Sequence, residues 1–163
     1  MKYLDLVILA GGKGTRIRDL TNNKPKPLAK IGPYTFLDLL LSNVSKYHFR
    51  KIIILAGFKG KQLFDKYHNK TVNLVKIKCI IEKKPLGTGG GLNKIKNKIT
   101  NNFFVINGDT ISDFNFYDLL KLKKKNKSVI ALTKSKFSSE GNNIRNLYSA
   151  KNNLVKIAKK KDR

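Results

Sequence analysis

A glycine-rich loop follows the first apolar segment of the chain and carries two cationic side chains. The apolar run from Leu4 to Leu9 stops just before the sequence Gly11-Gly-Lys-Gly-Thr-Arg16. Glycine lets a backbone approach an anion closely, and consecutive N–H groups in such a turn point into one concavity. Arg16 can hold a phosphate through two parallel hydrogen bonds. The loop therefore predicts a polyphosphate site, although a glycine turn after a first strand is also a common structural turn.

The spacing within this loop excludes two frequent nucleotide-binding motifs. A dinucleotide fingerprint needs a third glycine at the position that Ile17 occupies. No stretch of the chain fits the Gly-x-x-x-x-Gly-Lys-Ser/Thr pattern of a P-loop. We therefore expect neither a nicotinamide-dependent enzyme nor a P-loop ATPase.

Two further residues have the chemistry that a phosphate site needs. Lys26 stands between Pro25 and Pro27, so its backbone has little freedom and its ammonium can neutralise charge on a phosphoryl group. Asp109 follows an apolar strand in an Asn-Gly-Asp turn, where a carboxylate suits Mg²⁺. The alternatives are a solvated basic turn for Lys26 and a simple turn former for Asp109.

Predicted strands and helices alternate along the chain with short connections. Three prolines exclude a continuous helix from the basic loop at residues 12–33, and Thr35 is a candidate N-cap for the helix that follows. The apolar pattern predicts strands at 4–9, 51–56, 74–81, 103–106 and 129–133. It predicts helices at 36–49, 61–67, 92–99 and 116–122. The glycines at 87–91 predict a turn, and the short segments 144–148 and 154–157 predict a hairpin.

This alternation predicts an α/β protein with a Rossmann-like, mostly parallel sheet covered by helices on both faces. Ligands of such sheets bind beyond the carboxyl ends of the strands. Both glycine turns and Asp109 follow predicted strands, so we expect all three at the same edge of the sheet.

Length and composition favour one globular domain over residues 1–163, with 40% apolar residues. No apolar run is long enough to span a bilayer, and the amino terminus does not resemble a signal peptide, so we expect a cytoplasmic protein. Cys79 is the single cysteine and lies in an apolar run, which favours a buried side chain without a disulfide. With only His48 and His68 beside it, a zinc cluster is not expected.

The chain is strongly basic, with 35 Lys and Arg residues against 10 Asp and Glu and a net charge of +25. The lysines are spread through every predicted element, and the chain is also rich in Asn, Ile, Phe and Tyr. That mixture is typical of an AT-rich coding sequence. The alternatives are attraction of anionic substrates and affinity for nucleic acid or a membrane surface.

Four motifs, in order from residue 4 to about 120, resemble the sugar-phosphate nucleotidyltransferase family. They are Gly11-Gly-x-Gly-Thr-Arg16, Pro25-Lys-Pro-Leu28, Glu82 with Pro85-Leu-Gly-Thr-Gly-Gly90, and Asn107-Gly-Asp-Thr110. The last two are most similar to the branch that acts on heptose or mannose 1-phosphates. The resemblance implies a GT-A-like nucleotidyltransferase fold and transfer of a nucleoside monophosphate from an NTP to a sugar 1-phosphate, with release of pyrophosphate. The resemblance further implies that the NDP-sugar product supplies the synthesis of cell-surface polysaccharide, including lipopolysaccharide.

The resemblance also implies a role for each matching residue. Arg16, Lys26 and Asp109 would be catalytic, with Lys26 on the α-phosphate and Asp109 holding Mg²⁺. The acceptor phosphate would itself be the nucleophile, and the favoured pair is GTP with D-glycero-D-manno-heptose 1-phosphate or mannose 1-phosphate. The residues implied to bind nucleotide are Leu9, Ala10, Gly11, Gly12, Gly14, Thr15, Glu82, Gly87, Thr88 and Gly108.

The acceptor half of the family pattern is largely missing from this sequence. Family members continue through a Glu-Lys pair, an Asn-x-Gly segment and a second metal-binding aspartate. Lys161 is a candidate counterpart of the sugar-phosphate lysine, but no aspartate after Asp109 matches the second metal ligand. Three hypotheses follow: an active enzyme or its amino-terminal portion, an inactive homologue that binds nucleotide, and a basic nucleic-acid-binding protein. No module specific for nucleic acid is recognisable, which disfavours the third.

Overall fold

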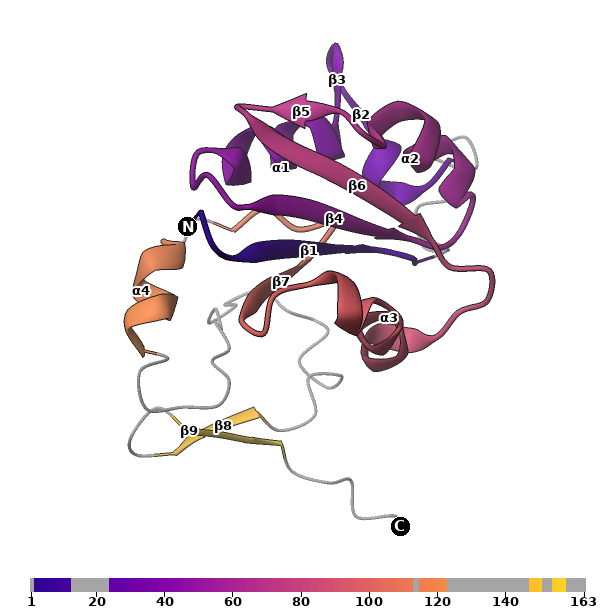
Figure 1. Cartoon of the computed structure of the whole chain (residues 1–163). Coiled ribbons are helices and arrows are strands. Elements are labelled where there is room, and N and C mark those ends of the chain that lie inside the picture. Colours follow the sequence, from indigo (N-terminus) through magenta and orange to yellow (C-terminus); the bar gives the residue numbers. More distant parts are fainter. Residues whose placement is uncertain (1, 13–23, 113–114, 123–146, 151–153, 158–163) are drawn as a thin grey trace. The chain divides into compact units, whose positions relative to one another are not determined.

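The computed structural model describes residues 2–12, 24–112, 115–122, 147–150 and 154–157 (Figure 1). The chain divides into two compact units, Met1–Asp113 and Phe114–Arg163. The single domain predicted over residues 1–163 stays a prediction. Within the described ranges, no helix is long and apolar enough to cross a membrane.

The first unit is built on a five-stranded sheet of mostly parallel strands. The spatial order is β5 (Thr71–Val72), β6 (Val75–Ile81), β4 (Lys51–Ala56), β1 (Asp5–Ala10) and β7 (Phe103–Asn107). β1, β4, β6 and β7 run parallel, and β5 is antiparallel to β6. The chain moves outward from β1 through β4 to β6 and then returns to place β7 on the other side of β1. The carboxyl ends of β1 and β7 therefore form the switch point at which such sheets bind ligands.

Helices cover both faces of this sheet, as the sequence predicts (Figure 1). α1 (Phe36–Ser45) and α2 (Gly60–Tyr67) lie on one face, and α3 (Gly87–Ile95) lies on the other. Because strand side chains alternate between faces, Val7, Ile53 and Leu55 share one side and pack with Ile95 of α3. The remaining strand positions face α1 and α2, where the buried side chains include Leu6, Ile8, Ile52, Ile54, Leu37, Leu41 and Leu63.

The start of α1 agrees with the predicted N-cap. The Thr35 hydroxyl accepts a hydrogen bond from the Asp38 N–H, and Asp38 accepts one from the Thr35 N–H, which completes a capping box. The predicted end at residue 49 is wrong, because the helix stops at Ser45. The chain leaves the helical conformation there, with His48 at a φ of 49°.

The glycine segment at 87–91 forms a helix, where the sequence predicted a turn. α3 begins at Gly87 and ends at Ile95, and a 3₁₀ turn, η3 (Lys96–Lys98), replaces the end of the helix predicted at 92–99. Glycine disfavours helix by about 1 kcal/mol per residue relative to alanine, so local propensity alone argues against this helix. Packing of the buried Gly91 and Ile95 against the sheet outweighs that cost.

Four further short elements were absent from the prediction. The predicted loop at 12–33 contains the 3₁₀ turn η2 (Lys26–Leu28) and the strand β2 (Lys30–Ile31), which pairs with β3 (Tyr34–Thr35). The turn between them includes Gly32 at a φ of 58°. β5 pairs with the start of β6, and Leu74 lies in the turn between them, so the strand predicted from residue 74 begins at Val75.

The second unit contains α4 (Phe116–Leu122) and a hairpin of β8 (Leu147–Ala150) and β9 (Leu154–Ile157). The predicted helix at 116–122 and the predicted antiparallel pairing are confirmed. The first strand of the hairpin is displaced toward the carboxyl terminus from the predicted 144–148. The strand predicted at 129–133 lies outside the described residues.

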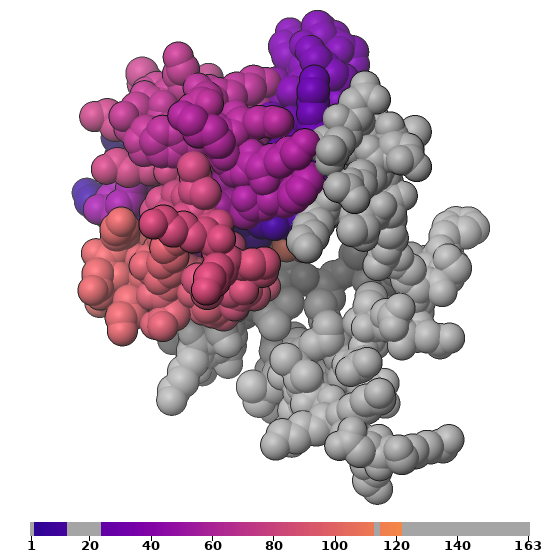
Figure 2. All heavy atoms as spheres, turned by 90° about the vertical axis from the view of Figure 1, so that its right-hand side faces the viewer, coloured from indigo at the N-terminus to yellow at the C-terminus, as the bar shows by residue number. Residues whose placement is uncertain are grey.

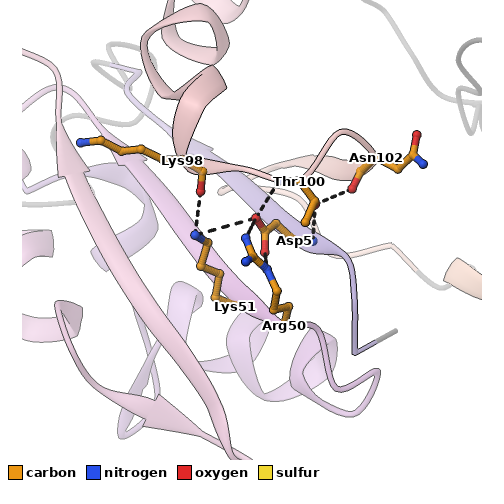
Figure 3. Close-up of polar contacts among 6 residues, drawn as sticks. All are labelled: Asp5, Arg50, Lys51, Lys98, Thr100 and Asn102. Carbon is orange, nitrogen blue, oxygen red and sulfur yellow. Dashed lines mark hydrogen bonds and ion pairs between the residues drawn. The ribbon is translucent and has the colours of Figure 1, made fainter.

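A buried carboxylate joins the strands at the end of the sheet opposite the switch point (Figure 3). Asp5 is fully buried and accepts two hydrogen bonds from Arg50, at 2.8 and 2.7 Å, and one from the Thr100 N–H at 3.0 Å. Lys51 Nζ lies 3.9 Å from Asp5 Oδ2 and donates to the Lys98 carbonyl. These contacts connect the amino ends of β1 and β4 with the segment before β7, and so help to fix the order of strands that creates the switch point.

Candidate active site

A cavity of about 830 Å³ opens at the carboxyl edge of the sheet. Figure 2 faces this edge, where indigo atoms from the end of β1 are recessed between the magenta and coral parts of the chain. The ends of β1, β4, β6 and β7 meet η2 and the start of α3 around it. The residues that line the cavity are Leu9, Ala10, Gly11, Gly12, Lys26, Pro27, Leu55, Glu82, Pro85, Leu86, Gly87, Thr88, Gly91, Asn107, Gly108 and Asp109.

Every predicted site residue that the structure describes lines this cavity. These residues are Leu9, Ala10, Gly11, Gly12, Lys26, Glu82, Gly87, Thr88, Gly108 and Asp109. Gly14, Thr15, Arg16 and Lys161 lie outside the described residues, so their predicted roles have no structural counterpart here. The structure thus gathers side chains from four separate stretches of sequence into one space, while the role of each residue stays a prediction.

The backbone of Gly11 is fixed by the turn that follows β4. The Phe58 N–H donates to the Gly11 carbonyl at 3.2 Å. A Cβ on Gly57 would lie 2.6 Å from that carbonyl oxygen, closer than any side chain can approach. Gly57 therefore lets the two loops lie against each other. Gly57 was not predicted as a site residue, because in the sequence it is simply a glycine that follows a buried strand.

Gly108 closes the switch point between β1 and β7. Its N–H donates to the Leu9 carbonyl at 2.8 Å, and a Cβ at this position would lie 3.0 Å from the same oxygen. It would also crowd Ile8 and Ala10 at 3.2 and 3.3 Å. The absence of a side chain at position 108 therefore holds the turn tightly against β1, and Asp109 follows at a fixed place in the cavity.

Lys26 and Asp109 form an ion pair inside the cavity. Lys26 Nζ donates to Asp109 Oδ2 at 2.8 Å, with the side chains 39% and 37% exposed. Partial burial by itself would raise the pKa of Asp109. The hydrogen bond and positive charge of Lys26, together with the Thr110 hydroxyl at 3.2 Å, outweigh burial and lower that pKa below its usual value. Asp109 is therefore a stable anion that faces a cation.

Glu82 brings a second carboxylate to the cavity, at the end of β6. Its N–H donates to the Ala56 carbonyl at 2.7 Å, which continues the pairing of β6 with β4. Its Oε1 is buried and has no hydrogen-bond partner among the described residues. Buried polar atoms are seldom left unpaired, and such an atom beside a cavity is a candidate ligand contact.

The start of α3 contributes hydrogen-bond donors to the cavity wall. Gly87 and Thr88 are its first two residues, and no side chain caps the helix from Leu86. The first N–H groups of a helix have no partner within the helix and carry partial positive charge. Gly87 has a φ of 66°, a conformation that favours glycine. This wall is therefore suited to oxygen acceptors or anions.

Some lining residues were not predicted as site residues: Pro27, Leu55, Pro85, Leu86, Gly91 and Asn107. Four of them lie inside the sequence motifs, so the sequence did contain a signal for them: Pro27, Pro85, Leu86 and Asn107. The sequence contained no signal for the other two. Leu55 has the pattern of a buried strand residue, and Gly91 is the last residue of the predicted glycine turn.

The donor set fits a magnesium ion that is shared with a phosphate ligand. Among the described residues, no three His, Cys, Asp or Glu side chains come together as a metal cluster. Mg²⁺ commonly uses one or two carboxylates and fills its remaining positions with substrate phosphates and water. Asp109 supplies such a carboxylate, and it already faces a cation in Lys26 Nζ.

Comparison with known proteins places this geometry in a family. The family model described as nucleotidyl transferase matches residues 6–141. D-glycero-alpha-D-manno-heptose 1-phosphate guanylyltransferase of Campylobacter jejuni is 35% identical over 129 residues, which are 79% of this chain and 56% of that protein. Mannose-1-phosphate guanylyltransferase of Mycobacterium tuberculosis is 32% identical over 130 residues, 79% of this chain and 36% of that protein.

A solved structure gives the same result for the fold. HddC from Yersinia pseudotuberculosis, crystallised in complex with GMP-PN, superposes with a TM-score of 0.67 at 33% identity. The match covers 75% of this chain and 55% of that one. The chain thus spans between about a third and just over half of these three relatives. On its sequence and its fold, the chain belongs to the nucleotidyl transferase family.

Proposed function

We propose that this chain contributes the nucleotide-binding part of an enzyme that transfers GMP from GTP to a sugar 1-phosphate, producing a GDP-sugar and pyrophosphate. The names of the two relatives support guanine as the base and a heptose or mannose 1-phosphate as the acceptor. The complex of HddC with GMP-PN supports a guanine nucleotide as the ligand of this fold.

The observation that carries the proposal is the position of Lys26 and Asp109. The two side chains come from separate motifs and pair at 2.8 Å beside the β1–β7 switch point. They line the same cavity as the described glycines of the first loop and the start of α3. A polyphosphate there would meet backbone N–H groups, one cationic side chain and one carboxylate for a metal ion.

The reaction needs positioning and charge neutralisation more than proton transfer. An oxygen of the acceptor phosphate attacks the α-phosphorus of GTP, and the bond from that phosphorus to the bridging oxygen of pyrophosphate breaks. The acceptor phosphate is already anionic, so no protein base is required. Lys26 stabilises the extra negative charge on the α-phosphate, while the backbone of Gly11 and Gly12 orients the triphosphate.

Asp109 would hold Mg²⁺ in this proposal, and the ion would neutralise charge on the phosphate oxygens. Lys26 would then turn from the carboxylate toward the α-phosphate. The exchange keeps one cation next to Asp109 in both states, so the anion is never left unpaired.

Pyrophosphate release by the purified chain tests the proposal. The assay would contain Mg²⁺, one of GTP, UTP, dTTP, ATP or CTP, and heptose 1-phosphate, mannose 1-phosphate or glucose 1-phosphate, with the product identified by mass spectrometry. We expect a GDP-sugar with a heptose or mannose acceptor. Calorimetric GTP binding without product would instead support a protein that binds nucleotide only, and absence of both would contradict the proposal.

A further inference from the structure

The amino ends of the parallel strands form a second surface, at the end of the sheet opposite the cavity. β1, β4 and β6 run in the same direction, so their starts lie together, on the left-hand side of Figure 1. The loop before β7 is held beside them, because Lys51 Nζ donates to the Lys98 carbonyl at 2.6 Å. The segments 2–5, 46–51, 72–76 and 96–100 make up what we call the amino-end surface.

A large apolar side chain, Leu74, is exposed in the turn between β5 and β6. It is 90% exposed, more than any other large apolar side chain among the described residues. Asn73 and Leu74 form the two-residue turn, with φ values of 44° and 65°. Such turns favour glycine at their second position, and a leucine with positive φ is strained. The chain therefore keeps an apolar side chain in solvent where a glycine would fit the backbone better.

The fold holds this turn in place. Asn73 Nδ2 donates to Ser45 Oγ at 2.8 Å, which ties the turn to the end of α1. Tyr3, just before β1, is a second exposed apolar side chain of the amino-end surface, at 85%. Only β4 separates β1 from β6, so the two strands are about 10 Å apart. Two exposed apolar side chains are therefore presented by one surface.

Positive charge surrounds these apolar side chains. The exposed lysines of the surface are Lys2, Lys46, Lys76, Lys96 and Lys98, and none of them forms an ion pair with a described residue. Asp5 is the one acidic residue of the four segments, and it is buried and paired with Arg50. Figure 3 shows Arg50 and Lys51 pointing toward Asp5, whereas the Lys98 side chain points away from it. The exposed lysines are therefore left uncompensated.

We propose that the amino-end surface binds an anionic phospholipid bilayer, with Leu74 and Tyr3 at the boundary between headgroups and acyl chains and the lysines beside the lipid phosphates. Burial of apolar side chains and attraction to anionic headgroups add when a protein lies on such a membrane. Tyrosine suits this boundary, because its ring is apolar and its hydroxyl stays hydrated. The inference goes beyond the proposed function and does not depend on it.

A nucleic acid fits this surface less well than a bilayer does. Proteins commonly hold nucleic-acid phosphates with arginine, but Arg50 already donates two hydrogen bonds to Asp5. An exposed leucine gains nothing from a phosphate backbone, whereas it gains free energy when a bilayer removes it from water.

Membrane binding through this surface would leave the cavity accessible. The cavity opens at the carboxyl ends of the strands, and the amino-end surface lies at their other ends. A nucleotide could therefore reach the cavity from solution while the chain is bound to the bilayer.

Sedimentation of the whole chain with lipid vesicles tests the proposal. The vesicles are phosphatidylcholine alone, or phosphatidylcholine with about one third phosphatidylglycerol. We expect binding to the anionic vesicles that weakens as salt is added, and binding to the neutral vesicles that is weaker by about tenfold or more.

Leu74→Asn separates the apolar contact from folding, because asparagine tolerates the positive φ of this position. The variant should melt at or above the wild-type temperature, yet bind the anionic vesicles about tenfold more weakly. Ile31→Asn is the matched control, since it removes an exposed apolar side chain from β2, outside the amino-end surface. Its vesicle binding should equal that of the wild type.

Two lysine pairs provide the second readout. Lys76→Gln combined with Lys98→Gln should weaken binding to anionic vesicles by about fivefold per lysine. Lys83→Gln combined with Lys84→Gln removes the same charge from exposed residues after the carboxyl end of β6, and should change binding by less than about twofold.

Three results would overturn the proposal and leave the proposed function standing. The first is wild-type vesicle binding by Leu74→Asn. The second is an equal loss in the two lysine pairs, which would show that net charge alone drives binding. The third is binding to random duplex DNA without binding to anionic vesicles, which would assign the surface to nucleic acid.

Discussion

Lys26 Nζ lies 2.8 Å from Asp109 Oδ2, although 83 positions separate the two residues in the sequence. Lys26 is fixed by η2, which the Leu28 N–H closes with a hydrogen bond to the Pro25 carbonyl. Asp109 is fixed by the contact of Gly108 with β1. Two rigid local structures therefore present opposite charges at one switch point.

Replacing Lys26 removes the cation proposed to stabilise the α-phosphate. We expect Lys26→Ala to lower turnover by roughly 10²–10³, the scale of one lost transition-state donor. The measurement is the rate of pyrophosphate release at saturating GTP and acceptor. Lys30→Ala is the matched control, because Lys30 is exposed on β2 and does not line the cavity. Wild-type turnover in Lys26→Ala would remove Lys26 from the mechanism.

Replacing Asp109 tests the proposed magnesium ligand. Asp109→Asn keeps the size of the side chain and removes its charge, so GTP affinity should become nearly independent of Mg²⁺ concentration. Titration of GTP binding against Mg²⁺ is the measurement, with Asp65→Asn as the control. Asp65 forms an exposed ion pair with Lys61 on α2 and does not line the cavity. If Asp109→Asn keeps the magnesium dependence of the wild type, the ion is held elsewhere.

The buried Asp5 should be important for stability. Asp5→Asn loses the charge-assisted hydrogen bonds to Arg50, and we expect a loss of about 3 kcal/mol in the free energy of unfolding. Urea denaturation of the wild type and the variant measures this difference in the free energy of unfolding. The control, Asp118→Asn, removes an exposed pair with Lys121 and should cost no more than about 0.5 kcal/mol. Equal losses in the two variants would contradict the assigned role of burial.

The lowered pKa of Asp38 predicts that this residue stabilises the folded protein less in acid. Its burial raises its pKa, but hydrogen bonds from Lys66, Thr35 and Tyr67 outweigh this and lower the pKa from 3.8 to about 2. A carboxylate with a lowered folded-state pKa stabilises the protein above its unfolded pKa. That stabilisation is lost as the pH falls through the folded pKa. The shift corresponds to about 2 kcal/mol, present above about pH 4 and lost by about pH 2.

Urea denaturation at several pH values would check this contribution. Asp38→Asn should be about 2 kcal/mol less stable than the wild type at pH 6, and the difference should shrink as the pH falls from about 4 to about 2. Asp65→Asn is again the control, since its exposed pair should add little at any pH. A difference between Asp38→Asn and wild type that does not change with pH would show that the carboxylate charge is not its source.

Much of the fold was available from the sequence, because the signals were local and strong. The run Lys51–Ala56 reads as a buried strand, and it forms one. Thr35 followed by Asp38 predicts the start of α1, and the capping box is present. The turn predicted at 87–91 was wrong, because helix propensity describes an isolated segment and does not include its packing against the rest of the protein. The contacts of Gly91 and Ile95 with the rest of the unit decided the outcome.

The sequence by itself determined the chemistry of the site: a glycine loop, a lysine between prolines, and carboxylates at strand ends. It could not determine that Gly57 fixes Gly11, that Lys26 pairs with Asp109, or that Glu82 Oε1 is buried with no hydrogen-bond partner in the part of the chain that the structure describes. Those relationships depend on the order of strands in the sheet, which places β7 next to β1. Residue types set what a site can do, and long-range packing alone sets which of them meet.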